Sequence, residues 1–392
     1  MNARAIPASS WTSALIAALV GFGGTVALIV QAVQAMGGTP HQVASAVTAL
    51  CVGIAVTGAA LSLSLKMPIV LAWSMPGAAL VGASTLHPGW PIAIGAFMAA
   101  AVMMIVLGLV PALGRLAARI PASVASAMLA GVLLPFCLAL FRTLESDVVL
   151  AGVLILVFIA ARQRFPLYAL LIVLGVAVAL VFARGDVAGM PAGTLFGTLA
   201  PTAPEFSSRA IIGIGIPLFL VTLVSQNLPG LVVLRSSGYA PPPQPLLLFT
   251  GLTTLLLAPF GAYSVNLSAI TAAICTGADA HPDPARRWTV GLFYAGFYLL
   301  LALFSAPLVS LFLAMPMTTI AAITGIALIG PLAAALGNMM TAADDREAAI
   351  LTFAATASGM SLFGIGSAFW GLVVGFTAIA ARAWLARPKA AM

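Results

Sequence analysis

The polar groups that could do chemistry inside the apolar stretches of this chain are amides and hydroxyls. They are Gln31, Gln34, Ser74, Thr222, Ser225, Gln226, Asn227, Tyr263, Ser264, Asn266, Ser268 and Thr271. An amide donates hydrogen bonds to a carboxylate without a charge that would repel it, whereas an acidic residue would better suit a neutral substrate with N–H donors. The groups present therefore indicate a site for a small organic anion.

Neighbouring residues separate structural from binding roles. Single hydroxyls and amides in membrane bundles commonly make interhelical hydrogen bonds, and this is the interpretation favoured for Ser225, Thr271 and Gln34. Gln226 and Asn227 are adjacent amides, and a helix-disturbing proline follows them two residues later. These two are predicted to bind substrate.

Aromatic side chains near these groups could form walls for a substrate ring. They are Phe22, Trp73, Phe219, Phe260 and Tyr263. The alternative for each is ordinary packing against helices or lipid. The choice between wall and packing stays open at this point.

No arrangement of residues predicts an enzyme. HExxH, GxSxG, a P-loop and paired carboxylates inside apolar stretches are all absent, and the acidic residues fall in connections or at segment ends. Cys51, Cys137 and Cys275 lie inside apolar segments and show neither a disulfide framework nor metal-ligand spacing. The sequence therefore predicts no catalytic residue, no cofactor and no metal site.

Two stretches must position the polar groups, residues 69–81 (IVLAWSMPGAALV) and 262–274 (AYSVNLSAITAAI). Neither can cross a bilayer as one helix, which takes about 20 apolar residues, so each is predicted to break between an extended start and a short helix. The break falls on Ser74 and on Asn266, residue types that cap a helix N-terminus. Capping is compatible with lining a site, because irregular backbone at membrane depth survives only along a protected cavity.

Composition places the chain in a membrane. It is 62% hydrophobic and 6% charged, against about 25% charged residues in globular proteins. No cleavage site of small residues follows the first apolar stretch, so this stretch is predicted to be a retained helix and not a signal peptide. The net charge of +7 is interpreted as an orientation signal, with no nucleic-acid partner.

Fourteen apolar segments can be placed between clusters of Gly, Pro and charged residues. They cover residues 11–35, 43–64, 68–84, 91–110, 121–140, 146–161, 166–183, 209–229, 245–258, 261–277, 288–312, 316–337, 347–361 and 365–385. With a cytoplasmic N-terminus, only Arg142, Arg184 and Arg209 among the basic residues fall outside, as the positive-inside rule requires. Twelve or thirteen crossings stay open, and the charge bias favours fourteen with both termini cytoplasmic.

The two halves are predicted to be an inverted repeat. Seven segments in each half make the second half enter the bilayer from the opposite side, after the connection at 184–209. Ser74 and Asn266 are 192 positions apart, and Gln31 and Gln226 are 195 positions apart. Two separate offsets close to half of the 392-residue chain support a repeat.

Four stretches resemble one known family. They are AWSMPGAAL at 72–80, RIPASVASAMLAGVLL at 119–134, SQNLPGLVVLRSSGY at 225–239 and APFGAYSVNLSAITAAICTGADAHPDPARRW at 258–288. Together they resemble the benzoate/proton symporter family of the BenE type, and the last stretch is the most specific. That family is similar in architecture to nucleobase transporters and sulfate-type anion exchangers.

The resemblance implies an all-α polytopic membrane protein with about fourteen segments in a 7+7 inverted repeat. Segments 3 and 10 would each be a short strand followed by a half-helix, and a core domain would move against a gate domain in an elevator or rocking motion. The implied first repeat is 1–200 with core segments in 11–110 and gate segments in 121–183, and the second is 201–392 with core segments in 209–312 and gate segments in 316–385.

The resemblance also implies a substrate site between segments 1, 3, 8 and 10. Together with the residue analysis above, the predicted site is Ser74, Gly77, Gln226, Asn227, Asn266, Gln31 and Tyr263. Nucleobase transporters typically carry acidic residues in segments 8 and 10, where this chain has amides, which argues against a nucleobase. The function implied is secondary active import of benzoate or a similar aromatic carboxylate.

Its partners would be that carboxylate, a proton and the lipid bilayer of a bacterial inner membrane, with a homodimer possible. Alternatives are a nucleobase or inorganic-anion transporter of the same fold, an anion channel, and a membrane scaffold that transports nothing. Proton coupling is the open point, because the apolar segments hold no obvious titratable group. The proton is predicted to enter with the carboxylate itself or through a segment-end acid such as Asp279 or Glu145.

Overall fold

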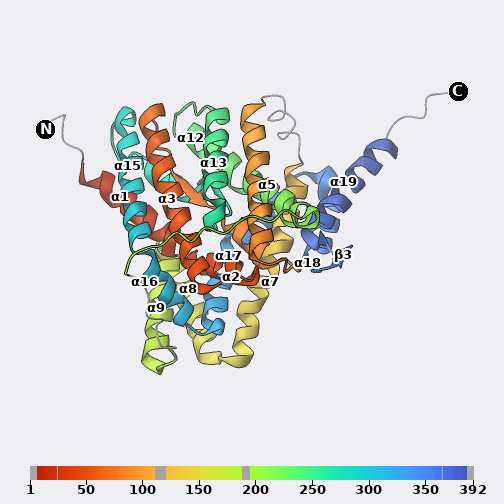
Figure 1. Ribbon diagram of the computed structural model, residues 1–392, viewed down its shortest axis with the longest axis horizontal. Helices are drawn as coiled ribbons and strands as arrows, with labels where there is room; N and C mark the ends of the chain where they lie inside the picture. The colour runs from red at the N-terminus through yellow and green to blue at the C-terminus, as the bar shows by residue number, and fades with distance from the viewer. Residues whose placement is uncertain (1–6, 24, 111–120, 188–194, 364, 386–392) are drawn as a thin grey trace.

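The computed structural model describes residues 7–23, 25–110, 121–187, 195–363 and 365–385 and is mostly helical (Figure 1). The first half contains α1 (Ala8–Gly23), α2 (Val26–Ala35), α3 (Pro40–Leu65), β1 (Leu71–Trp73), α4 (Met75–Gly82), α5 (Trp90–Leu109), α7 (Ala122–Ser146), α8 (Val148–Arg164) and α9 (Ala169–Arg184). The second half contains α10 (Ser208–Ala210), η1 (Ile211–Gly215), α11 (Ile216–Thr222), η2 (Leu223–Asn227), α12 (Leu228–Ser236), α13 (Pro243–Leu257), η3 (Ala258–Phe260), β2 (Val265–Leu267), α14 (Ile270–Thr276), η4 (Pro284–Arg286), α15 (Trp288–Leu303), α16 (Ser305–Ala314), α17 (Met317–Met339), η5 (Ala343–Asp345), α18 (Arg346–Ala357), β3 (Ser361–Leu362), β4 (Ile365–Gly366) and α19 (Ser367–Leu385).

Each of the fourteen predicted segments coincides with one helix or with a short run of joined elements. Among the described residues, eight helices are long and apolar enough to cross a membrane. The count is nine if Pro284–Leu303 and Ser305–Ala314, which meet at a bend of 61°, form one span together. The chain is therefore a multi-pass membrane protein. The predicted count of fourteen crossings is not confirmed, because α8, α9 and α18 have only 17, 16 and 12 residues.

The two strand and half-helix units are confirmed. β1 and β2 pair in antiparallel fashion, with Ala72 opposite Asn266, and α4 and α14 begin shortly after the strands end. These paired residues are 194 positions apart, a spacing that lies between the two offsets seen in the sequence. A further hairpin of β3 and β4 precedes α19, and no sequence signal predicts it.

A serine hydroxyl accepts a backbone N–H group near the start of each half-helix. The Ser74 hydroxyl accepts a hydrogen bond from the backbone N–H of Gly77 at 2.9 Å, as predicted for an N-cap. The same prediction for Asn266 is wrong, because Asn266 lies within β2 and α14 begins only at Ile270. Ala269 is the N-cap of α14 and has no capping side chain, but the hydroxyl of Ser268, one residue earlier, accepts a hydrogen bond from the N–H of Thr271 at 3.3 Å.

Polar side chains from other helices stabilise the backbone of the short strands. Leu267 donates its N–H to Asn227 Oδ1 at 3.1 Å, and the Tyr294 hydroxyl donates to the Leu71 carbonyl at 2.9 Å. Water is absent from a bilayer core, so a strand at that depth needs such protein partners. Several of the amides and hydroxyls in the apolar segments therefore have a structural task.

Segment 8 is one long run, Ser208–Ser236, with two π-helical turns. In the second turn, η2, the N–H of Leu228 bonds to the Leu223 carbonyl five residues earlier. Pro229 follows and has no N–H to continue an ordinary α-helical ladder. Such wide turns are frequent at functional sites, and this one carries Ser225 and Gln226.

The helices pack in two sets. In the first, α3 packs against α15 and α5 against α13, and in the second, α7 packs against α17 and α18, and α18 against α19 (Figure 1). We call α1–α5 and the elements from α10 to α16 the core-side elements. The gate-side elements are α7–α9 and those from α17 to α19, and the division of the chain into core and gate domains stays a prediction.

Candidate functional site

A cavity of about 520 Å³ lies between the core-side and gate-side elements. This volume is within the usual range of about 300–1,000 Å³ for small-molecule sites. Its core-side walls come from the end of α1 and Thr25 before α2, the start of α4, the η2 turn and the residues that lead into α14. Its gate-side walls come from α7, α8, the start of α9 and the second half of α17.

One of the seven predicted site residues, Gln226, lines this cavity. Its neighbour Asn227 is fully buried and turned away, because its Oδ1 accepts from Leu267 N–H and its Nδ2 lies 3.7 Å from Met104 Sδ. The two adjacent amides therefore have different environments. Gln226 faces the cavity, and Asn227 holds η2 against β2.

Ser74, Tyr263 and Asn266 are outside the cavity lining, and the side chains of Tyr263 and Asn266 bond to the backbone around Ser74. The Tyr263 hydroxyl donates to the Ser74 carbonyl at 2.9 Å. The Asn266 amide donates to the Ala72 carbonyl at 3.3 Å in one orientation, and in the flipped orientation it accepts from the Ser74 N–H at 3.1 Å. These side chains fix the start of α4 relative to β2.

Gly77 and Gln31 are also outside the cavity lining. A Cβ at Gly77 would lie 2.9 Å from Leu218 Cδ1, so the glycine permits close packing of α4 against α11. Gln31 is half-buried in α2. Substrate binding by these two residues stays a prediction.

Three residues of the cavity lining have a backbone N–H group without a protein acceptor. Within the described chain, the N–H groups of Met75, Ala269 and Ile270 donate to no protein atom, and all three residues line the cavity. Met75 is the first residue of α4, where N–H groups have no intrahelical acceptor and the helix dipole is positive. The start of α4 therefore brings a partial positive charge to the core-side wall.

The chain is similar to known membrane transport proteins. The profile of the BenE family, described as benzoate membrane transport proteins, matches residues 5–381.

The chain belongs to the BenE family.

It is 37% identical over 377 residues to the inner membrane protein YdcO of Escherichia coli strain K12, covering 96% of each chain. It is 33% identical over 372 residues to the benzoate membrane transport protein of Acinetobacter baylyi, covering 94% of each. The fold is similar to the transmembrane domain of the cyanobacterial bicarbonate transporter BicA, with a TM-score of 0.63 and 15% identity over 94% of this chain and 97% of that one. SLC26A9 also matches, with a TM-score of 0.63 and 13% identity over 94% of this chain and 65% of that one.

This member of the BenE family is therefore a membrane transport protein and not an enzyme. Its cavity has one of the five aromatic side chains proposed as walls, Trp73. The indole N–H of Trp73 donates to the Thr25 hydroxyl at 2.7 Å, and its ring packs edge-on against Phe22 at 5.7 Å between centroids. A second aromatic wall, Phe158 of α8, has no counterpart in the predicted set.

Several polar residues of the cavity were not predicted from the sequence to bind substrate. Ser225 and Thr271 line the cavity, although they were assigned to interhelical hydrogen bonding. Ser225 bonds to the Val221 carbonyl of its own run at 2.6 Å, whereas Thr271 bonds to the Ser268 hydroxyl at 2.6 Å and also to Tyr294 of α15, as expected for an interhelical contact. Ser126, Arg162 and Asn338 come from the gate-side helices, and no spacing signal links them to segments 3, 8 and 10.

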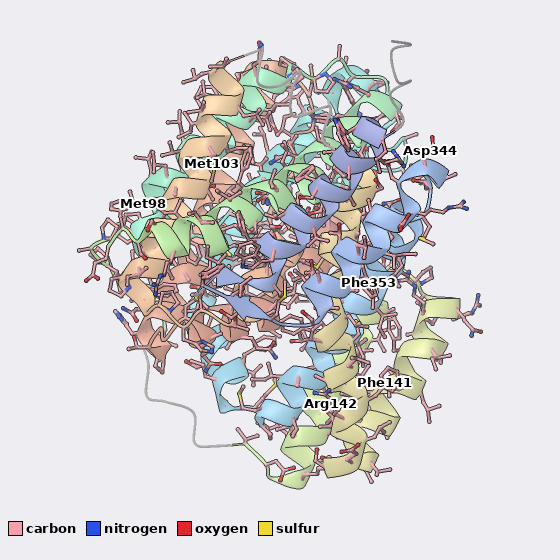
Figure 2. All side chains as sticks on the ribbon, turned by 90° about the vertical axis from the view of Figure 1, so that its right-hand side faces the viewer. Met98, Met103, Phe141, Arg142, Asp344 and Phe353 are labelled. Atoms are coloured by element: carbon pink, nitrogen blue, oxygen red, sulfur yellow. The ribbon has the colours of Figure 1, made fainter. Side chains whose placement is uncertain are left out.

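The cavity opens beside the ends of three gate-side elements. Arg162 near the end of α8, Leu167 before α9 and Asn338 near the end of α17 line it and are exposed. Figure 2 shows Asp344, in the turn after α17, and Arg142, near the end of α7, at opposite ends of the molecule. Asn338 is close to the end of α17 that leads to Asp344, so the opening is at the end of the molecule that carries Asp344.

Proposed function

We propose that this protein carries benzoate or a closely similar aromatic carboxylate across a bacterial inner membrane by proton symport. The observation that carries the proposal is the cavity, whose lining combines Trp73 and Phe158 with Gln226 and with residues whose backbone N–H groups have no protein acceptor. The apolar walls suit a ring, and the uncharged donors suit a carboxylate. The curated relative in Acinetobacter baylyi, whose name specifies benzoate, supports the same substrate.

Movement between two states would follow from the position of the cavity between the core-side and gate-side elements. If the inverted repeat and the cytoplasmic termini are as predicted, the end that carries Asp344 is cytoplasmic, and the structure is open inward. Release to the opposite side would need the core-side elements to slide against α7 and α17. This is the elevator or rocking motion expected for repeat-built transporters.

The proton would travel on the substrate. Within the described part of the chain, no Asp, Glu or His lines the cavity, and Asp279 and Glu145 are exposed away from it. A substrate that binds as the ionised carboxylate and takes up a proton before translocation crosses the membrane as a neutral acid, which avoids the cost of moving a buried charge. Proton coupling would then need no titratable side chain.

Uptake into proteoliposomes tests this proposal. Labelled benzoate is offered under an inward proton gradient, with and without a protonophore, and protein-free liposomes serve as the reference because benzoic acid crosses lipid unaided. We expect accumulation above the reference that collapses with the protonophore. Equilibration without accumulation would indicate a channel, and no excess over the reference would overturn the proposal.

A second candidate is inorganic-anion transport, which the fold shared with the bicarbonate transporter BicA favours. Uncharged amide and backbone donors would bind bicarbonate as well as a carboxylate. Gradient-driven uptake of bicarbonate, with none of benzoate, would establish this alternative.

Replacing Gln226 by alanine is expected to weaken benzoate binding by about 10-fold or more, because a hydrogen bond to a charged group contributes about 1.5–3 kcal/mol. Equilibrium binding of labelled benzoate to the purified protein measures the effect. Gln34→Ala is the matched control, since Gln34 is an amide of α2 that lies outside the cavity lining and has no predicted role in substrate binding. An equal loss of affinity in both variants would contradict the role given to Gln226.

A further inference from the structure

Arg162 is the charged side chain of the cavity. Every other lining residue in the described part of the chain is apolar, an amide, a hydroxyl or glycine. The ion pairs of the described chain lie elsewhere, between Arg184 and Asp147 at 2.5 Å and between Arg382 and Asp345 at 2.8 Å. Arg162 thus brings a positive charge to the cavity with no carboxylate of the described chain within 4.0 Å.

The neighbouring Arg164 shows that this placement is specific. The two arginines are two residues apart at the end of α8, so they point to sides of the helix about 200° apart. The Arg164 guanidinium lies over the Phe165 ring, 5.7 Å from its centroid, outside the cavity lining. Both residues can serve as membrane orientation signals, but Arg162 alone faces the cavity.

The guanidinium of Arg162 lies against α17 at Gly330. A Cβ at Gly330 would be 3.8 Å from Arg162 Nη1 and 3.9 Å from Nη2, so both terminal nitrogens reach the α17 wall. Phe158, one helical turn earlier on the same face of α8, also lines the cavity. Together they present a planar cation beside an aromatic ring.

We propose that Arg162 and Phe158 form a gate-side subsite that binds an aromatic carboxylate at the cavity mouth. The guanidinium pairs with the carboxylate through parallel N–H bonds, and Phe158 packs against the ring. This subsite rests on the proposed function and lies on the wall opposite Gln226. It would select ionised carboxylates over neutral ring compounds before they reach the core-side wall.

The test compares the purified full-length wild type with Arg162→Gln, Arg162→Lys and the matched control Arg164→Gln. Both glutamine variants remove one positive charge from the end of α8. Equilibrium binding of labelled benzoate is measured at low and at physiological ionic strength, with benzamide as an uncharged competitor, and thermal unfolding shows that each variant is folded. Arg162→Lys keeps the charge but loses the planar fork.

We expect Arg162→Gln to bind benzoate about 10-fold more weakly than the wild type at low ionic strength, and Arg164→Gln to bind within about twofold. Affinity of the wild type should fall with added salt, and that dependence should largely vanish in Arg162→Gln. Preference for benzoate over benzamide should also fall in Arg162→Gln and recover partly in Arg162→Lys. These differences would establish the subsite.

Equal binding by Arg162→Gln and Arg164→Gln, with unchanged salt dependence, would overturn the subsite while leaving benzoate transport intact. Absence of benzoate binding and uptake by the wild type would instead overturn the proposed function, and the subsite with it. The wild-type and variant arms therefore separate the two failures.

Discussion

A disulfide between cysteines placed at Thr85 and Gly366 is expected to abolish transport. Thr85 follows α4 among the core-side elements, and Gly366 ends β4 among the gate-side elements. A Cβ at Gly366 would lie 3.7 Å from Thr85 Oγ1, so a cysteine at each position brings the two side chains into contact, which a disulfide requires.

The cross-link is expected to stop transport because of where this contact lies. Thr85 and Gly366 line a space of about 50 Å³ with residues of α4, η1 and α7, apart from the opening of the main cavity. In the proposed inward-open state this contact closes the route to the opposite side. A covalent bond there prevents the core-side elements from moving past the gate-side elements, which transport requires.

The measurement is benzoate uptake by the Thr85→Cys, Gly366→Cys double variant after oxidation, and again after reduction with dithiothreitol. The native Cys51, Cys137 and Cys275 are buried, so they are poor competitors for the oxidant. Each single variant should retain transport under oxidation. Uptake at the wild-type rate by fully cross-linked protein would contradict movement at this contact.

Replacing Asn227 by alanine is expected to lower the free energy of unfolding by about 2 kcal/mol, because a buried donor left without an acceptor costs about 1–3 kcal/mol. The lost acceptor is Oδ1, which receives the N–H of Leu267 at 3.1 Å in the interior of the protein. Without it, β2 loses its link to η2, and the start of α14 is no longer fixed. Transport should therefore fall together with stability.

Equilibrium unfolding in a denaturing detergent measures this prediction, and Gln226→Ala is the matched control. Gln226 is the neighbouring amide of the same π-turn but faces the cavity, so its loss should weaken binding and leave the free energy of unfolding within about 0.5 kcal/mol of the wild type. If Asn227→Ala unfolds like the wild type and only binding is lost, Asn227 is a substrate ligand and not a structural residue.

The broken segments could be predicted because their signal is physical and local. An apolar stretch too short to cross a bilayer, with Pro76 just after Ser74, leaves few structures other than an extended start and a half-helix. The spacing of the two halves predicted them to be counterparts in a repeat, but it did not predict that their strands pair with each other. The register that places Ala72 opposite Asn266 could not be fixed from the sequence, and this is why Asn266 was taken for a cap.

The site was less predictable because residue type does not determine which way a side chain faces. Gln226 and Asn227 have the same chemistry and adjacent positions, yet the π-turn directs one into the cavity and the other into the interior. The cavity residues of the gate-side helices could not be predicted for a different reason. Arg162 sits at a helix end, where the positive-inside rule already accounts for a basic residue.

Crystals of the protein grown with 4-bromobenzoate would locate the substrate directly through anomalous scattering from bromine. We predict a single strong bromine peak inside the main cavity near Trp73, with the carboxylate toward the amide of Gln226. An empty cavity under saturating ligand, with the bromine peak bound at another part of the protein, would contradict the claim that this cavity carries an aromatic carboxylate.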